Sequence, residues 1–207
     1  MLTLIHAPMS RSSRIVTLID EMGIQDWVKI EPVSILRTDG SGTVDASNPH
    51  PEGKVPLLIH DGAVIRESGA IIQYLTDMFP DAGLGRTIGD AQRGEYISWL
   101  YWYGSVMEPV MIFESLGLAQ PALARTFRGK SELTAKLTAA LQKGPYLLGD
   151  TYSAVDLLVQ SPYAWFKDAT PDDPAIRDWV ARCSARPSIA RTIASDKTLM
   201  VQAAAAA

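Results

Sequence analysis

Two polar neighbours, Glu67 and Ser68, interrupt the apolar stretch GKVPLLIHDGAVIRESGAIIQYL, residues 53–75. A carboxylate such as that of Glu67 pairs with ammonium groups. Ser68 stands where a helix is expected to begin, and a helix start offers unpaired backbone N–H groups and partial positive charge to an anion. The helix start could therefore bind a carboxylate, while an ordinary N-cap is the alternative interpretation of Ser68.

A proline lies inside the first apolar run of the same stretch. Pro56 has no N–H to donate to a sheet, so its strand is expected at an edge or a bulge, where an extended peptide could pair with Val55. A plain edge proline is the alternative. Lys54, just before, could meet a carboxylate or be a solvated loop lysine.

Three hydroxyl residues follow the first apolar run of the chain in the sequence HAPMSRSSR, residues 6–14. Ser10, Ser12 and Ser13 all stand close to the expected start of a helix. Each hydroxyl could act in chemistry there, and each could instead be an N-cap.

Other kinds of site find little support. His6, His50 and His60 show no metal-binding spacing and no GxSxG sequence occurs, so we expect no metal and no serine hydrolase. The single Cys183 excludes an internal disulfide and a CxxC pair. A net charge of −4 without any Lys/Arg run argues against a nucleic-acid partner.

The sequence predicts a cytoplasmic protein. Its N-terminus lacks the charged and apolar regions of a secretory signal. The most apolar stretch, ISWLYWYGSVMEPVMIF, contains Glu108 and Pro109 and is shorter than the roughly 18 apolar residues that a membrane span needs. We therefore expect no contact with a membrane.

Periodicity and turn residues divide the chain into two domains. A small α/β domain over residues 1–79 is predicted from the order β-α-β, loop, β-β-α, with elements at 2–6, 14–21, 27–33, 55–60, 63–65 and 68–78. A Gly- and Pro-rich linker covers 80–88. Residues 89–207 are expected to be all helical, with segments at 89–117, 121–143, 153–169, 173–184 and 187–200.

The succession of KVPLL, then ES before a helix, then GDTYSAVD resembles the cytosolic glutathione transferase family along essentially the whole chain. The resemblance implies a thioredoxin-like N-terminal domain that binds glutathione and an all-helical C-terminal domain that shapes the pocket of the second substrate. It also implies a homodimer. The expected activity is that of a transferase of detoxification, which activates the glutathione thiol for attack on a small hydrophobic electrophile.

The resemblance gives the residues of the opening stretch their roles. Pro56 would be cis, and Val55 would pair through its backbone with the cysteinyl unit of glutathione. Ser68 and the helix start would bind the γ-glutamyl carboxylate, while Glu67 would pair with the α-ammonium. Lys54 could meet the glycyl carboxylate.

Ser10 is the candidate partner of the glutathione thiol. Neither a tyrosine near His6 nor a cysteine near Ser10 is present, and Ser10 precedes Arg14 by four residues, as in Ser-type members of the family. Its hydroxyl would donate a hydrogen bond to the sulfur and so favour the thiolate. Ser12 and Ser13 remain rivals for this role.

Four further residues are candidates for substrate contacts. His50 lies in the long loop RTDGSGTVDASNPHPEG close to the expected glutathione site. Tyr103, Met107 and Met111 lie about one helical turn apart in the aromatic segment that, in the family, borders the electrophile pocket. Such a stripe is also typical of an ordinary core, and Pro109 is expected to kink this helix.

Two alternatives to conjugation stay open at this point. The same thiolate would serve a glutathione-dependent isomerase or peroxidase. A non-catalytic relative that keeps the fold as an interaction or regulatory module is the other alternative, although the motifs for glutathione are present here.

Overall fold

The computed structural model describes residues 1–206 and separates into two compact units. Residues 1–75 together with the C-terminal segment from Arg186 form the first unit, and Thr76–Ala185 form the second. This division differs from the sequence-based boundaries at 79 and 89 in two ways. It falls inside a helix, and the last helix of the chain belongs with the N-terminal unit.

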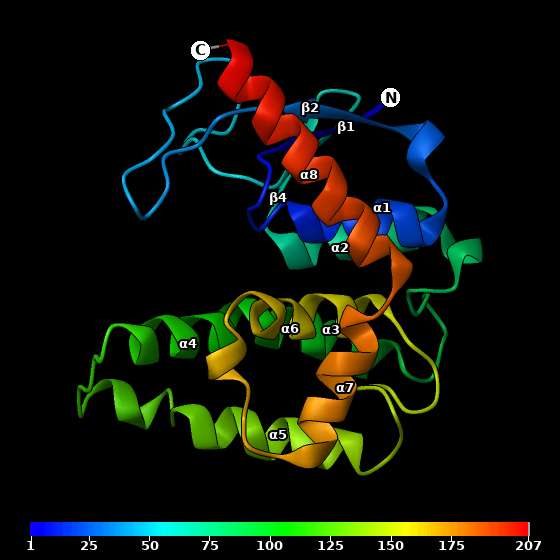
Figure 1. Ribbon diagram of the computed structural model, residues 1–207. Coiled ribbons are helices and arrows are strands. Elements are labelled where there is room, and N and C mark those ends of the chain that lie inside the picture. The colour runs from blue at the N-terminus through cyan, green and yellow to red at the C-terminus, as the bar shows by residue number, and fades with distance from the viewer. Residues whose placement is uncertain (207) are drawn as a thin grey trace. The chain divides into compact units, whose positions relative to one another are not determined.

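The first unit is built on a four-stranded mixed sheet with the strand order β2-β1-β3-β4. β1 pairs in parallel with β2 and antiparallel with β3, which forms a hairpin with β4. The strands and the two helices that follow β1 and β4 are β1 (Leu2–His6), β2 (Val28–Pro32), β3 (Leu57–His60), β4 (Ala63–Arg66), α1 (Ser13–Met22) and α2 (Ser68–Met78). The strand order confirms the expected thioredoxin-like arrangement; Figure 1 labels β1, β2, β4, α1 and α2 of this unit.

The C-terminal helix α8 (Pro187–Ala206) packs on α1 in this unit (Figure 1). Its buried residues Ser188, Thr192 and Asp196 are spaced by four, so they form one stripe along the helix. Thr192 meets the hydroxyl of Thr17 at 2.9 Å. Hydrogen bonds between polar side chains therefore help to hold α8 against α1.

The second unit is all helical, as the sequence predicts. Its helices are α3 (Arg93–Trp102), α4 (Glu108–Ser115), α5 (Lys130–Leu141), α6 (Ala154–Trp165) and α7 (Pro174–Ser184). The expected kink at Pro109 takes the form of a π-helical segment, Tyr103–Met107, between α3 and α4. Pro109 has no N–H to donate to the preceding turn, so the chain widens just before it.

The GDTYSAVD motif folds as the capping box of α6. The Asp156 carboxylate accepts hydrogen bonds from the Ser153 backbone N–H at 2.9 Å and from the Trp179 ring N–H at 2.9 Å. All three residues are buried. Within the described residues, no helix is long and apolar enough to cross a membrane.

Candidate functional site

The register of the sheet brings the sequence motifs to one end of it. Ile5 of β1 pairs with Leu57 of β3, which pairs in turn with Arg66 of β4. The chain leaves these three positions through the loop 7–12, through the Val55–Pro56 bond before β3, and into Glu67 and Ser68. Because the strands are aligned, all three segments lie at the same end of the sheet.

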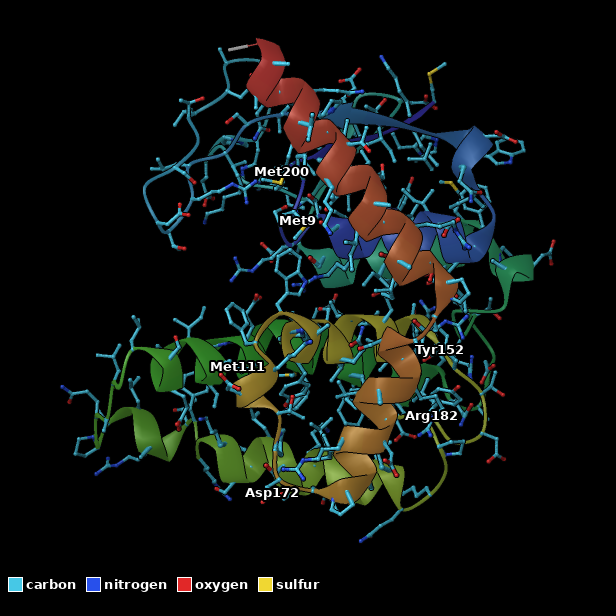
Figure 2. All side chains as sticks on the ribbon, in the orientation of Figure 1. Met9, Met111, Tyr152, Asp172, Arg182 and Met200 are labelled. Atoms are coloured by element: carbon cyan, nitrogen blue, oxygen red, sulfur yellow. The ribbon has the colours of Figure 1, made fainter. Side chains whose placement is uncertain are left out.

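The loop between β1 and α1 is held in an unusual conformation. Met9, labelled in Figure 2, has a φ of 53°, in the left-handed region that non-glycine residues rarely adopt. Its backbone N–H donates to Asp196 of α8 at 2.7 Å. The Arg37 guanidinium donates to the carbonyls of Met9 at 3.0 Å and of Pro8 at 2.7 Å. Two charged side chains distant in sequence therefore fix this loop.

The three candidate serines differ in their access to solvent. Ser10 is partly exposed, whereas Ser12 and Ser13 are buried. Ser12 Oγ lies 2.8 Å from Nδ1 of His6, and Ser13 donates its hydroxyl to Asp196. The contacts and the burial of Ser12 and Ser13 leave Ser10 as the serine best placed to meet a ligand.

The N-cap alternative does not hold for Ser12, whereas Ser10 Oγ accepts the Ser12 backbone N–H at 3.1 Å, as a capping residue does. Ser12 occupies the N-cap position, but its side chain makes no capping hydrogen bond to the helix. Its hydroxyl oxygen instead accepts the Ala7 N–H at 3.1 Å and lies 2.8 Å from Ser10 Oγ. Side-chain contacts therefore link Ser10 to Ser12, and Ser12 to His6 at the end of β1.

A buried histidine and carboxylate lie beneath the serines. His6 Nε2 lies 3.0 Å from Asp196 Oδ1, and both side chains are only 1% exposed. Burial by itself would raise the pKa of Asp196, but hydrogen bonds from His6, Ser13 and the Met9 backbone outweigh it and lower that pKa. Asp196 is therefore an ionised acceptor. Sequence analysis gave neither residue a functional role.

The peptide bond between Val55 and Pro56 is cis in the structure. Val55 is half-buried and precedes β3, whose paired residues begin at Leu57. Its backbone therefore lies just beyond the paired part of the strand, where a short peptide could extend the sheet.

Glu67 also has a strained backbone. Its φ is 69°, its side chain is exposed, and α2 begins at the next residue, Ser68. A left-handed glutamate costs roughly 1 to 3 kcal/mol, and such strain is found mainly at functional sites. Glu67 thus stands in a constrained backbone position at the helix start, with its side chain open to solvent.

Lys54 and His50 make local contacts. Exposed Lys54 forms an ion pair with Glu52. His50 is buried in the long loop, and its Nδ1 accepts the backbone N–H of Glu52 at 3.0 Å. Lys54 remains accessible to a ligand, whereas His50 has a clear role in shaping the loop.

The candidate residues for the electrophile pocket divide by burial. Tyr103 and Met107, at the two ends of the π-helical segment, are 2% and 0% exposed. Tyr103 Oη lies 3.4 Å from a Glu108 carboxylate oxygen. Met111 on α4, labelled in Figure 2, is partly exposed and is the best placed of the three to meet a substrate.

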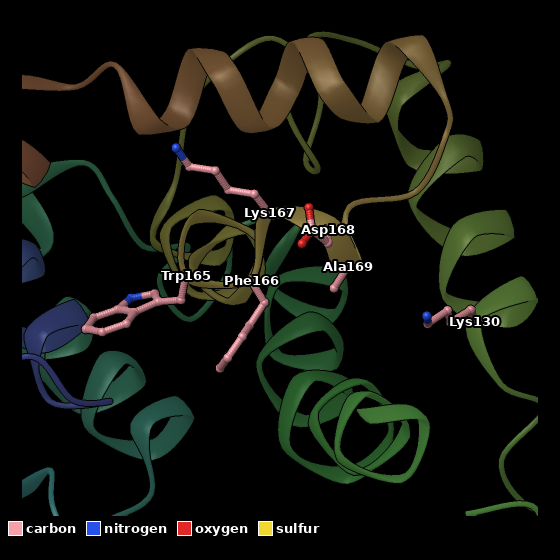
Figure 3. A pocket seen from close by; sticks show the side chains of 6 residues that line it. All are labelled: Lys130, Trp165, Phe166, Lys167, Asp168 and Ala169. Carbon is pink, nitrogen blue, oxygen red and sulfur yellow. The ribbon is translucent and has the colours of Figure 1, made fainter. Parts of the chain in front are cut away.

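A shallow depression in the helical unit adds residues that sequence analysis did not single out. Figure 3 shows it at the end of α6, and its lining consists of Lys130, Trp165, Phe166, Lys167, Asp168 and Ala169. Trp165 and Phe166 are 47% and 67% exposed, which is unusual for large aromatic side chains. Sequence analysis placed both residues inside a predicted helix, 153–169, and so did not single them out. In the structure, α6 already ends at Trp165.

The sequence is similar to those of known glutathione S-transferases. Residues 4–83 match the family model for the glutathione S-transferase N-terminal domain. The chain is 26% identical to glutathione S-transferase U27 of Arabidopsis thaliana over 90% of this chain and 85% of that protein. It is 27% identical to protein LigF of Sphingobium over 68% of this chain and 73% of that protein.

Solved structures of similar fold cover almost the whole chain. A glutathione transferase from Methylococcus capsulatus is 26% identical, with a TM-score of 0.75, over 96% of this chain and 100% of the other. A sphingomonad glutathione S-transferase solved with glutathione is 22% identical, with a TM-score of 0.73, over 94% of this chain and 98% of the other. With the thioredoxin-like sheet, the cis Val55–Pro56 bond and the capping box of α6 in place, residues 4–83 are a glutathione S-transferase N-terminal domain, and the chain as a whole is similar to glutathione S-transferases.

Proposed function

We propose that this protein binds glutathione at the end of the sheet formed by the loop 7–12, Val55–Pro56 and Glu67–Ser68, and that Ser10 activates its thiol. The enzyme is a glutathione transferase, and glutathione is its co-substrate. The observation that supports the site most strongly is the shared register of Ile5, Leu57 and Arg66, which brings three separate motifs together.

Each part of glutathione has a partner of matching chemistry in this proposal. The γ-glutamyl carboxylate meets the N-terminus of α2 at Ser68, and the α-ammonium pairs with Glu67. The cysteinyl backbone extends the sheet at Val55. The sulfur then lies toward Ser10, and Lys54 is available to the glycyl carboxylate.

Ser10 acts on the ionised sulfur in this proposal. Its hydroxyl donates a hydrogen bond to the thiolate and so lowers the free energy of the charged form. A drop of about two units in the thiol pKa corresponds to about 2.7 kcal/mol, which a charge-assisted hydrogen bond can largely supply. The thiolate is the nucleophile that attacks the second substrate.

The second substrate in this proposal is a small hydrophobic electrophile. Met111 is the candidate contact, and Tyr103 and Met107 support it from the core around the π-helical segment. A homodimer and a cytoplasmic location complete the proposal, as the family resemblance implies.

Binding and turnover are tested separately. The wild-type protein should be retained on immobilised glutathione and eluted by free glutathione, and it should conjugate at least one member of a panel of hydrophobic electrophiles. Glu31→Gln, on the outer strand β2, is the matched control and should behave as wild type. Retention without turnover would favour the non-catalytic alternative, and loss of retention in the wild type would contradict the site.

A further inference from the structure

A continuous chain of hydrogen-bonding groups runs from the candidate site into the core of the first unit. Ser10 Oγ lies 2.8 Å from Ser12 Oγ, and Ser12 Oγ lies 2.8 Å from His6 Nδ1. His6 Nε2 lies 3.0 Å from Asp196 Oδ1. The outer end of this chain is partly exposed, and the other three side chains are buried.

The carboxylate fixes the orientation of the imidazole. Ionised Asp196 can only accept hydrogen bonds, so His6 Nε2 carries the hydrogen between them. In the neutral ring Nδ1 is then a bare acceptor, and it faces the Ser12 hydroxyl. This is the arrangement of a serine, a histidine and a carboxylate in which the histidine takes a proton and the carboxylate stabilises the cation that forms.

We propose that His6 is the terminal acceptor of the glutathione thiol proton, which reaches it through Ser10 and Ser12, and that Asp196 positions and stabilises the protonated ring. The inference rests on the proposed function of Ser10. The S–H bond breaks and its electron pair stays on sulfur. Ser10 Oγ takes that proton and passes its own to Ser12 Oγ, which passes its own to Nδ1. The products are a thiolate, two neutral serines and an imidazolium.

The transfer also reverses the direction of the hydroxyl groups. Before it, Ser12 donates toward His6, while the Ser10 hydroxyl donates to the Ala7 carbonyl oxygen at 2.7 Å and turns toward Ser12 for the transfer. After it, the imidazolium donates to Ser12, Ser12 donates to Ser10, and the Ser10 hydroxyl turns toward the sulfur. The same step therefore removes the proton and supplies the hydrogen bond that stabilises the thiolate.

Several charged side chains belong to the segments around these hydrogen-bonding groups. Asp196 comes from α8, and Arg37, from the loop after β2, binds two carbonyls of the loop 7–12. Arg11 and Arg14 lie on that loop and on the first turn of α1, while β2 places a proline opposite His6. Asp196 is the anion bonded to the imidazole, so it is the group that compensates the charge arriving on His6.

The experiment observes the His6 ring directly by nitrogen NMR of protein labelled in its three histidines. At a pH where His6 of the free enzyme is neutral, glutathione should convert its signals from the Nε2–H tautomer to the imidazolium. S-methylglutathione, which has no thiol proton, should bind without this change. Calorimetry reports the binding of both ligands independently of the ring.

Variants separate the relay from a structural role. Ser12→Ala breaks the chain, and His6→Gln keeps a donor for Asp196 but cannot take a proton. In both, about one proton per thiolate should appear in the buffer, as ionisation requires, whereas the wild type should release much less. The control Thr192→Ala removes a buried hydroxyl from the same helix interface and should release as little as the wild type.

The possible failures are distinguishable. If glutathione does not bind, the proposed function fails and the relay fails with it. If glutathione binds as the thiolate while His6 stays neutral, or if S-methylglutathione protonates His6 equally, the relay alone is overturned. An imidazolium already present in the free enzyme throughout the pH range of activity would overturn it as well.

Discussion

Ser10 differs from its neighbouring serines in its access to solvent, and this difference decides which hydroxyl can meet a ligand. Ser12 and Ser13 are tied into contacts with His6 and Asp196, while Ser10 stands at the outer end of the same network. Sequence alone left the three as rivals because their spacing is equally compatible with the start of a helix. Burial separates them, and Ser13 is further held by Asp196 of α8.

The first prediction at this scale concerns the charge of Glu67. Glu67→Gln keeps the size of the side chain but removes the partner of the α-ammonium, so glutathione affinity should fall roughly tenfold to a hundredfold, the equivalent of about 1.5 to 3 kcal/mol. Cysteinylglycine, which lacks the γ-glutamyl arm, should lose little. Titration calorimetry with both thiols measures the two effects.

The matched control for this prediction is Glu31→Gln, which should leave both affinities unchanged. Circular dichroism should first show that the variant is folded, because Glu67 occupies a strained backbone position. Equal weakening of both thiols, or no weakening of either, would mean that Glu67 serves only the turn before α2.

At the scale of elements, α8 fixes the loop 7–12 near the other end of the chain through Asp196. Asp196 binds the backbone of Met9 and the side chains of His6 and Ser13, across 183 to 190 residues of sequence. The strands, α1 and α2 were predictable because each has a local signal of periodicity and turn residues. The docking of α8 was not, since nothing local says which unit a helix joins. Its buried polar residues, spaced by four, were the available signal.

Removing the charge of Asp196 should destabilise the first unit in a pH-dependent way. Its folded pKa is lowered from the ordinary value of 3.8, so its contribution to stability is fully present above that value and is lost as the pH falls through the folded pKa. Asp196→Asn should cost about 3 kcal/mol at neutral pH, the scale for breaking a buried ionic contact. The difference from wild type should shrink on acidification.

Chemical denaturation at several pH values measures this difference. Asp26→Asn, an exposed residue of the same unit, is the control and should change the free energy of unfolding by no more than about 0.5 kcal/mol. A cost for Asp196→Asn that is constant from neutral to strongly acidic pH would show that the side chain acts through packing rather than charge.

At the scale of the whole molecule, the chain combines two units with different sources of stability. The first relies on a sheet with apolar helices and on the polar stripe of α8. The second relies on the buried helix α6 and on the Asp156 network at its start. The order of domains and the family were predictable from KVPLL, ES and GDTYSAVD. The boundaries were not, because a helix runs through one of them.

Asp156 should be essential to the helical unit. Its carboxylate accepts the backbone N–H groups of Leu147 and Ser153 and the ring N–H of Trp179, all buried, and Asp156→Ala would leave these donors unpaired. At about 1 to 3 kcal/mol for each buried unpaired group, the unit should lose at least about 3 kcal/mol. Exposed Asp150→Ala is the control for the denaturation measurement. Equal stabilities of the two variants would contradict the structural role.

The activation of glutathione by Ser10 is tested most directly by the ionisation of the bound thiol. Ultraviolet difference absorption of the thiolate, recorded against pH, gives the thiol pKa in the wild type and in Ser10→Ala. The proposal predicts a pKa well below the ordinary thiol value of about 8.5 in the wild type. In Ser10→Ala it should rise toward that value while glutathione affinity changes by no more than a few fold. An unchanged thiol pKa in the variant would contradict the assignment of Ser10.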